Sequence, residues 1–227
     1  MYFKKIAIAI VLIGLAGAGI FSYYIYSVML VPNTNFNSKE AYIFIASNAS
    51  FSDVKADLEP LLKDIESFEV LASQKKYINN IKAGRFLISK GMTNNDIINS
   101  IRSRNLPIKI AFNNQHSLAD LANRISTQIE ANSTDLIAAF SDSGFLESNG
   151  FTNDNALAMY LPNSYEFFWN TSAITFRSRM LKEYNRFWND KRLNRAKSID
   201  LSPLEVMSLA AIVHEESKQA SEQDRIA

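Results

Sequence analysis

The chain has 227 residues and a formal net charge of +1, and 47% of its residues are hydrophobic. A charge this close to zero gives no electrostatic signature of nucleic-acid binding, and the apolar content suffices for a packed core. The chain lacks cysteine, which excludes disulfides, lipoprotein acylation, thiol catalysis and cysteine-bound metals. Its two histidines are too few for a histidine-rich metal site, so neither a metal nor another cofactor is expected.

The N-terminal segment is long and apolar. Residues 6–31 carry no charge, follow a lysine pair, and exceed the ~20 residues that cross a bilayer. The positive-inside rule keeps residues 1–5 in the cytoplasm and exports everything after the anchor. We therefore predict a single-pass protein of the bacterial cytoplasmic membrane whose remainder faces the periplasm or extracytoplasmic space. A cleaved signal peptide, with small residues at 16–18 as its cleavage site, is the alternative, although the apolar run continues well beyond them.

A small α/β module is predicted after a polar linker at 32–39. Apolar residues alternate or recur at helical spacing between residues 40 and 107, which indicates strands and amphipathic helices. The predicted elements are a strand at 41–47, helices from Ser52 and over 68–79, a strand at 81–89 and a helix capped by Thr93.

The remainder, 108–227, is predicted as a second, helix-rich α+β domain. Pro107 introduces a strand at 108–112, and two glycines precede the segment AMYLPNSYEF. Helices are expected at 117–130, at 133–141, as one long basic amphipathic segment over 174–193, and from Ser202 onward. The fold class is therefore α+β with an N-terminal transmembrane helix.

The helix that starts at Ser202 carries the strongest local signal. Serine is a good N-cap, proline suits the first helical position, and Glu205 completes a capping box. An apolar face is expected to point into the core, and it consists of Val206, Leu209, Ala210 and Val213.

The two glutamates at the end of this helix differ on the helical wheel. Glu216 lies about 50° from the centre of the apolar face, and Glu215 lies about 150° away. We therefore expect Glu215 to be solvated and Glu216 to lie at the margin of the core. Apolar surroundings would raise the pKa of Glu216, which suits a general acid. The alternative is an ordinary helix-end carboxylate that pairs with an arginine or lysine.

A zinc site at the same place is not expected. A zinc-protease helix requires H-E-x-x-H, but position 218 is lysine, and His116 is the only other histidine. His214 is therefore interpreted as a polar groove or surface residue.

Three stretches of the sequence resemble one protein family. LAAIVHEESKQASEQDRIA, which ends the chain, is similar to the segment L-A-S-I-(V/I)-x-x-E-(T/S) followed by A-S-E of the YceG-like or MltG endolytic murein transglycosylases. IKAGRFLISKGMTNNDIINSI resembles part of that family's LysM-like module, and YLPNSYEF resembles its Y-L-F-P-D-T-Y-x-F segment. The resemblance covers essentially the whole chain and implies a LysM-like module at 40–107 and the N-terminal part of a catalytic domain at 108–227.

The resemblance implies a reaction and a site. The family cleaves MurNAc-β-1,4-GlcNAc bonds of peptidoglycan without water and leaves 1,6-anhydro-muramyl ends, which terminates nascent glycan strands. The catalytic glutamate corresponds to Glu216, acting as a single general acid and base. The implied partners are peptidoglycan glycan strands and peptidoglycan synthases of elongation or division. The implied substrate contacts are Asn163, Tyr165, Glu166, Ser217 and Glu222.

The sequence also departs from the family pattern. Asn163 stands where the family has aspartate, and Gln223 where it often has arginine, so the substrate contacts are less secure than the glutamate. The family continues with N-R-L and D-P-T motifs, so we expect this chain to be a truncated form. Two other functions stay open at this point: a non-catalytic peptidoglycan-binding or division-scaffold protein, and a hydrolase acting on the same substrate.

Overall fold

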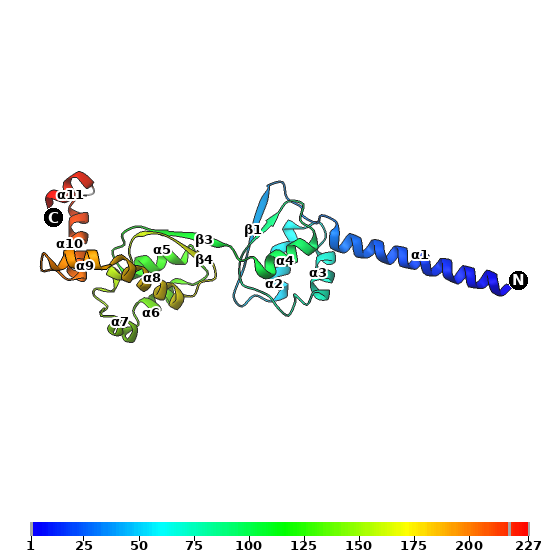
Figure 1. The fold of residues 1–227 in the computed structure, drawn as a ribbon, viewed down its shortest axis with the longest axis horizontal. Coiled ribbons are helices and arrows are strands. Elements are labelled where there is room, and N and C mark those ends of the chain that lie inside the picture. The colour runs from blue at the N-terminus through cyan, green and yellow to red at the C-terminus, as the bar shows by residue number, and fades with distance from the viewer. Residues whose placement is uncertain (1, 218, 227) are drawn as a thin grey trace. The chain divides into compact units, whose positions relative to one another are not determined.

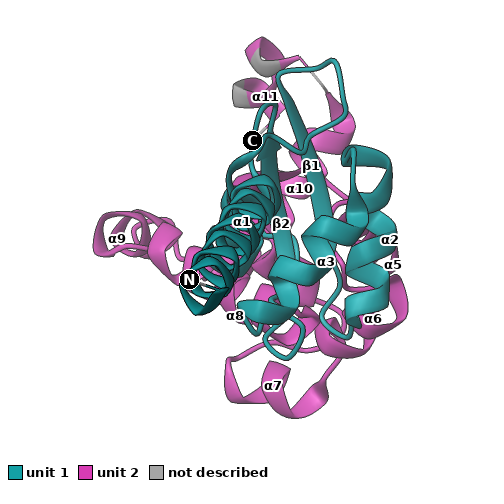
Figure 2. Cartoon of the chain, turned by 90° about the vertical axis from the view of Figure 1, so that its right-hand side faces the viewer, with its two compact units in different colours: residues 1–107, 168–170 teal, residues 108–167, 171–227 magenta. Residues whose placement is uncertain are grey.

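The computed structural model describes residues 2–217 and 219–226, which form two compact units. The first comprises residues 1–107 and 168–170, and the second comprises 108–167 and 171–227 (Figure 2). The protein is α+β: a long apolar helix at the N-terminus precedes a helix-rich remainder with two small sheets (Figure 1). This agrees with the fold class that the sequence predicts.

The first unit contains one sheet of two strands. Its elements are α1 (Tyr2–Leu30), β1 (Glu40–Ile45), α2 (Phe51–Leu58), the 3-10 helix η1 (Glu59–Leu61), α3 (Ile65–Gln74), β2 (Gly84–Ser89) and α4 (Asn94–Ser103). β1 and β2 pair antiparallel, with Ile43 opposite Phe86. These inward residues alternate with outward ones, and the inner face packs with the helices into one core.

Helix α1 is long and apolar enough to cross a membrane. Its C-terminal end is attached to the rest of the first unit by buried polar groups. Val28 is buried, and its carbonyl accepts a hydrogen bond of 2.9 Å from Nδ2 of Asn94. Nδ2 of Asn33 in turn donates to Oδ1 of Asn94 at 2.7 Å. The beginning of the segment expected to be a linker, including Asn33 and Thr34, is therefore buried in the unit.

One glycine is required where β2 begins. Gly84 has φ of +144°, and a Cβ there would collide with the side chain of Asn105. Oδ1 of Asn105 accepts a hydrogen bond of 3.0 Å from the backbone N–H of Arg85. The absence of a side chain at Gly84 therefore makes room for an amide that holds the strand end.

The second unit is mostly helical. Its elements are β3 (Pro107–Phe112), α5 (Leu118–Ser126), α6 (Ser133–Phe140), α7 (Ser143–Ser148), the 3-10 helix η2 (Ala156–Met159), β4 (Asn163–Phe168), α8 (Ala173–Phe187), α9 (Asp190–Lys197), α10 (Pro203–Glu216) and α11 (Ala220–Ile226). β3 pairs with β4, and large aromatic residues including Phe140 and Phe176 fill the core.

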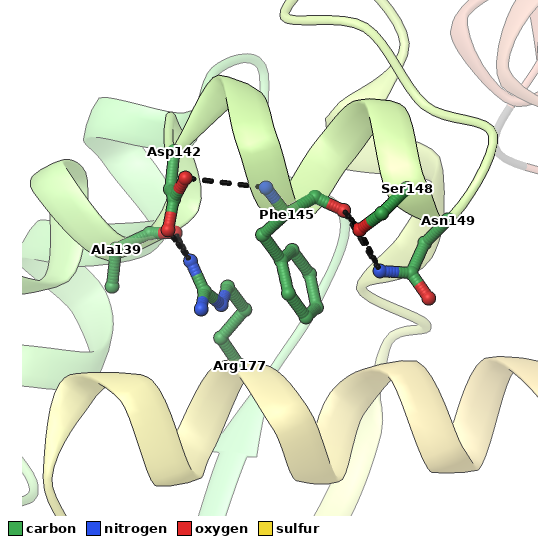
Figure 3. A network of polar contacts seen from close by, with 6 residues as sticks. All are labelled: Ala139, Asp142, Phe145, Ser148, Asn149 and Arg177. Atoms are coloured by element: carbon green, nitrogen blue, oxygen red, sulfur yellow. Dashed lines mark hydrogen bonds and ion pairs between the residues drawn. The ribbon is translucent and has the colours of Figure 1, made fainter.

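A charged network joins α8 to α6 and α7 (Figure 3). Arg177 of α8 is buried; its Nη1 donates to the carbonyl of Ala139 at 2.7 Å and to Oδ2 of Asp142 at 2.9 Å. Its guanidinium also lies 3.7 Å from the ring centroid of Phe145. The arginine lowers the pKa of Asp142 below its usual range. The network thereby ties α8 to α6 and α7 within this unit.

Several predicted helix boundaries differ from the observed ones. The helix expected from Ser52 starts one residue earlier, because the side chain of Ser50 caps it and Asp53 accepts a hydrogen bond from the Ser50 N–H. The helix expected over 68–79 is α3, which begins and ends earlier because Asp64 caps it. The single helix expected over 174–193 is two helices, because Oδ1 of Asn189 caps a new helix by accepting from the N–H of Arg192 at 3.1 Å.

Candidate functional site

Helix α10 begins as the sequence predicts. Oγ of Ser202 accepts from the N–H of Glu205 at 3.3 Å, and Oε2 of Glu205 accepts from the N–H of Ser202 at 2.7 Å. Pro203 occupies the first helical position. The hydrogen bonds from Ser202, the backbone N–H first and the hydroxyl second, lower the pKa of Glu205 below its usual range.

The expected apolar face of α10 is buried only in part. Val213 is buried and Val206 packs against the core of its unit, whereas Leu209 and Ala210 are exposed. A second stripe of the helix borders a cavity. This stripe, at the i, i+3, i+7, i+10 spacing of one helical face, is Leu204, Met207, Ala211 and His214.

A cavity of about 330 Å³ lies against this stripe within the second unit. Its other walls come from residues 112–115, which follow β3, and from the segment 154–162 around η2. Glu215 and His214 of α10 line it, and Glu216 does not. A neighbouring hollow is lined by both histidines of the chain, His116 and His214, together with Glu215. His214 thus lines a groove, as the sequence suggested.

Glu216 and Glu215 are both exposed, but they lie on different sides of α10. Glu215 is at the edge of the cavity. Glu216 follows Leu209 by seven residues and Val213 by three; Leu209 is 38% exposed, and Val213 is buried. Glu216 is therefore exposed itself and lies one helical turn from a buried apolar residue.

Ser217 and Glu222, both predicted as substrate contacts, meet directly after Glu216. Oγ of Ser217 donates to Oε2 of Glu222 at 2.6 Å and accepts from the N–H of Gln219 at 3.1 Å. Nε2 of Gln223 donates to the carbonyl of Ser217 at 3.0 Å. The carboxylate of Glu222 and the amide of Gln223 therefore both contact Ser217, directly after the helix end.

The three predicted contacts on β4 are spread over different environments. Tyr165 stacks on Phe112 with ring centroids 5.8 Å apart, and its hydroxyl donates to the carbonyl of Leu161 at 2.7 Å. Burial raises the pKa of Tyr165 to about 12, so it is a neutral structural tyrosine at physiological pH. Asn163 and Glu166 are exposed.

Asn163 also lines a hollow of its own with Ser164 and Arg124. This hollow shares Asn113 and Pro162 with the hollow that contains Glu215. The structure therefore brings Asn163 near the Glu215 side of the site. Within the described residues, no hydrogen bond or ion pair joins Glu216 to Asn163, Tyr165 or Glu166.

The sequence predicts a solvated Glu215, and the structure has this side chain exposed at the edge of the cavity. The cavity itself is not predicted, because the helical wheel considers only the most hydrophobic residues of α10. The spacing of Leu204, Met207 and Ala211 before His214 is an equally regular helical signal. No three His, Asp or Glu side chains of the described residues are arranged to hold a metal ion.

Comparison with known proteins gives a consistent family. The family model described as the YceG-like family matches residues 43–227. The crystal structure of a YceG-like protein of Listeria monocytogenes, lmo1499, matches with a TM-score of 0.50 and 19% identity, over 82% of this chain and 67% of that chain. At that identity the match concerns the fold alone, and a search of the curated proteins finds no match. Because the family model spans most of the sequence, including β2, β3, β4 and all of α10, the chain belongs to the YceG-like family.

Proposed function

We propose that the chain is a membrane-anchored endolytic lytic transglycosylase that cleaves peptidoglycan glycan strands, with Glu216 as its acid and base. The observation that carries this proposal is the family match, which extends through α10 and its LAAIVHEES segment. The exposed position of Glu216 supports it, because a carboxyl group that acts on a polymer must be reachable from solvent.

A single carboxyl group suffices for this reaction. Protonated Glu216 donates its proton to the glycosidic oxygen as the bond to the anomeric carbon breaks. The carboxylate then accepts the proton of the muramyl 6-hydroxyl, whose oxygen attacks the same anomeric carbon and closes the 1,6-anhydro ring. No water is consumed, and the enzyme returns to its starting protonation state. This differs from the pair of carboxyl groups in an ordinary glycosidase.

The location of the reaction follows from the anchor. Helix α1 is long and apolar enough to span the membrane, and lysines 4 and 5 flank its N-terminal end. The positive-inside rule then puts both compact units outside the cytoplasm, where peptidoglycan lies. A LysM-like role for the first unit, which would hold glycan near the catalytic unit, is part of this proposal.

The decisive experiment replaces each neighbouring carboxylate separately. Purified full chain is incubated with glycan strands, and the soluble products are identified by mass spectrometry. Glu216→Gln is expected to reduce release of anhydro-muramyl product by about 10²-fold or more, because the proton donor is lost. Glu215→Gln, at the edge of the cavity, is expected to cause only a partial loss. Glu147→Gln, exposed at the end of α7, is the unchanged control.

Two results would overturn the assignment. If Glu216→Gln keeps full activity while Glu215→Gln loses it, the cavity carboxylate is the catalyst. If the products carry reducing ends that are one water heavier than the anhydro form, the protein is a hydrolase.

One observation favours a second candidate, a non-catalytic glycan-binding protein. Glu216 lies outside the cavity that His214 and Glu215 line, so the described residues do not enclose it with other polar groups. Such a protein would retain glycan strands on a column and release no soluble product from them. Anhydro products from the unaltered chain would exclude this candidate.

A further inference from the structure

The outward face of the β1–β2 sheet is aromatic. Tyr42 and Phe44 point away from the core and are 42% and 44% exposed. The ring of Trp169, from the short segment that belongs to the first unit, lies edge-on to Phe44 with centroids 5.1 Å apart. A solvated sheet face normally carries polar residues, so a cluster of large aromatic side chains there indicates a contact surface. We refer to Tyr42, Phe44 and Trp169 as the aromatic platform.

A cation lies next to the aromatic platform. Arg85 stands opposite Phe44 in the strand register, and its guanidinium lies 3.8 Å from the ring centroid of Tyr42. Its Nη1 donates to the carbonyl of Pro107 at 3.3 Å. No carboxylate of the described residues forms an ion pair with Arg85. The guanidinium is therefore held in place, and no carboxylate of the described residues neutralises its charge by an ion pair.

Neighbouring groups fix the rings of the platform. Tyr42 is held by Arg85 on its face and by its hydroxyl, which donates to Oε2 of Glu40 at 3.2 Å. Phe44 is held by Trp169. Rings that are already ordered lose little side-chain entropy when a ligand packs on them, so the surface is prepared for binding.

We propose that the aromatic platform with Arg85 is a binding site for an anionic glycan strand. Pyranose rings present C–H groups that pack against the electron-rich faces of aromatic rings. The lactyl and peptide carboxylates of muramyl residues supply the negative charge that Arg85 lacks. Neutral polysaccharide or a purely apolar partner would use the rings and leave the guanidinium unpaired. The site lies in the first unit and is separate from α10; its ligand class rests on the proposed function.

The test measures binding directly, with one negatively charged ligand and one uncharged ligand. The full chain in detergent is titrated with lactyl-bearing glycan strands and with chitotetraose, which has no carboxylate. The double variant Tyr42→Ala/Phe44→Ala is expected to bind both ligands about tenfold or more weakly. Arg85→Gln is expected to weaken binding of the muramyl strands and to leave chitotetraose unaffected. Val70→Ala, an apolar residue of α3 with 39% exposure, is the matched control.

Tryptophan fluorescence gives a second readout that does not require loss of binding. The chain has two tryptophans, and Trp188 is buried in the second unit. In a Trp188→Phe variant, Trp169 is the only tryptophan, and its emission is expected to shift as glycan is added. Thermal unfolding of each variant shows whether it is folded. We expect the double variant to fold normally, because Tyr42 and Phe44 are both exposed.

Defined outcomes would overturn this inference. Glycan affinity that changes less than twofold in the double variant, or a Trp169 emission that is unchanged by saturating glycan, excludes the site. A change of oligomeric state with unchanged glycan affinity would mean that a second copy covers the platform. These results are independent of the proposed reaction, since product release from unaltered chain tests catalysis and the titrations test binding alone.

Discussion

Helices α4 and α10 both begin with a capping box, but their apolar side chains lie in opposite environments. Thr93 and Asp96 form a capping box before α4, as Ser202 and Glu205 do before α10. Yet α4 buries three isoleucines completely, whereas α10 buries only Val213 among its described residues. The caps determine where a helix begins, and the surroundings determine which of its faces is buried.

The difference has a structural cause. The buried side of α4 is packed into the core of the first unit, where β2 supplies Phe86 and Ile88 from its inner face. The corresponding side of α10 borders the cavity, so Met207 is only half-buried and Ala211 is exposed. Apolar side chains therefore contribute stability in α4 and form accessible surface in α10.

The largest expected effect is the difference in stability between two isoleucine-to-alanine variants, one in α4 and one in α10. Ile98→Ala in α4 removes a fully buried side chain and is expected to lower the free energy of unfolding of the first unit by about 3–4 kcal/mol. Ile212→Ala in α10, where the side chain is 59% exposed, is expected to change stability by no more than about 0.5 kcal/mol. Urea denaturation of the two variants measures both. Equal losses would contradict the comparison.

A smaller effect is expected at the caps. Thr93→Ala and Ser202→Ala each remove a side-chain acceptor, which costs about 1 kcal/mol. Because α4 is part of a core, the first change should lower the stability of its whole unit. The second should mainly increase hydrogen exchange in the first turn of α10. Thr93→Ser and Ser202→Thr keep the acceptor and serve as controls, and a global loss in Ser202→Ala would show that α10 is coupled to its core.

The smallest effect is a pH dependence at the start of α10. The pKa of Glu205 is lower in the folded chain than the usual 4.5, because Ser202 donates hydrogen bonds to the carboxylate. Its contribution is therefore complete above about pH 4.5 and is lost as the pH falls through the lower folded value. NMR titration of Glu205 checks the direction. Glu205→Gln preserves the capping box without a titrating group and should remove this dependence.

Local sequence signals predicted much of the fold. The alternation at 41–47 gave β1, and the caps at Thr93 and Ser202 gave the starts of α4 and α10. The break between α8 and α9 was missed because the amphipathic pattern continues across Asn189, although asparagine is itself a capping residue.

The candidate site was only partly predictable. The motif identified α10, its glutamates and the polar residues that follow, but the cavity beside the helix was not predicted. Helical periodicity gives two candidate stripes on α10, and only tertiary contacts with residues 112–115 and 154–162 select the one that contains His214. The same limit applies to Asn163, whose neighbour Arg124 comes from α5.

The hydrogen bond between Asn94 and the carbonyl of Val28 determines how much of α1 precedes the folded part of the first unit. At ~1.5 Å per residue, Val28 lies ~35 Å along α1 from Lys5, only slightly more than the ~30 Å thickness of a hydrocarbon core. If Lys5 stands at one boundary of a bilayer, the folded part of the first unit begins at the other boundary and is joined to the helix without a flexible tether. The distance between this folded part and the lipid is then set by the length of α1.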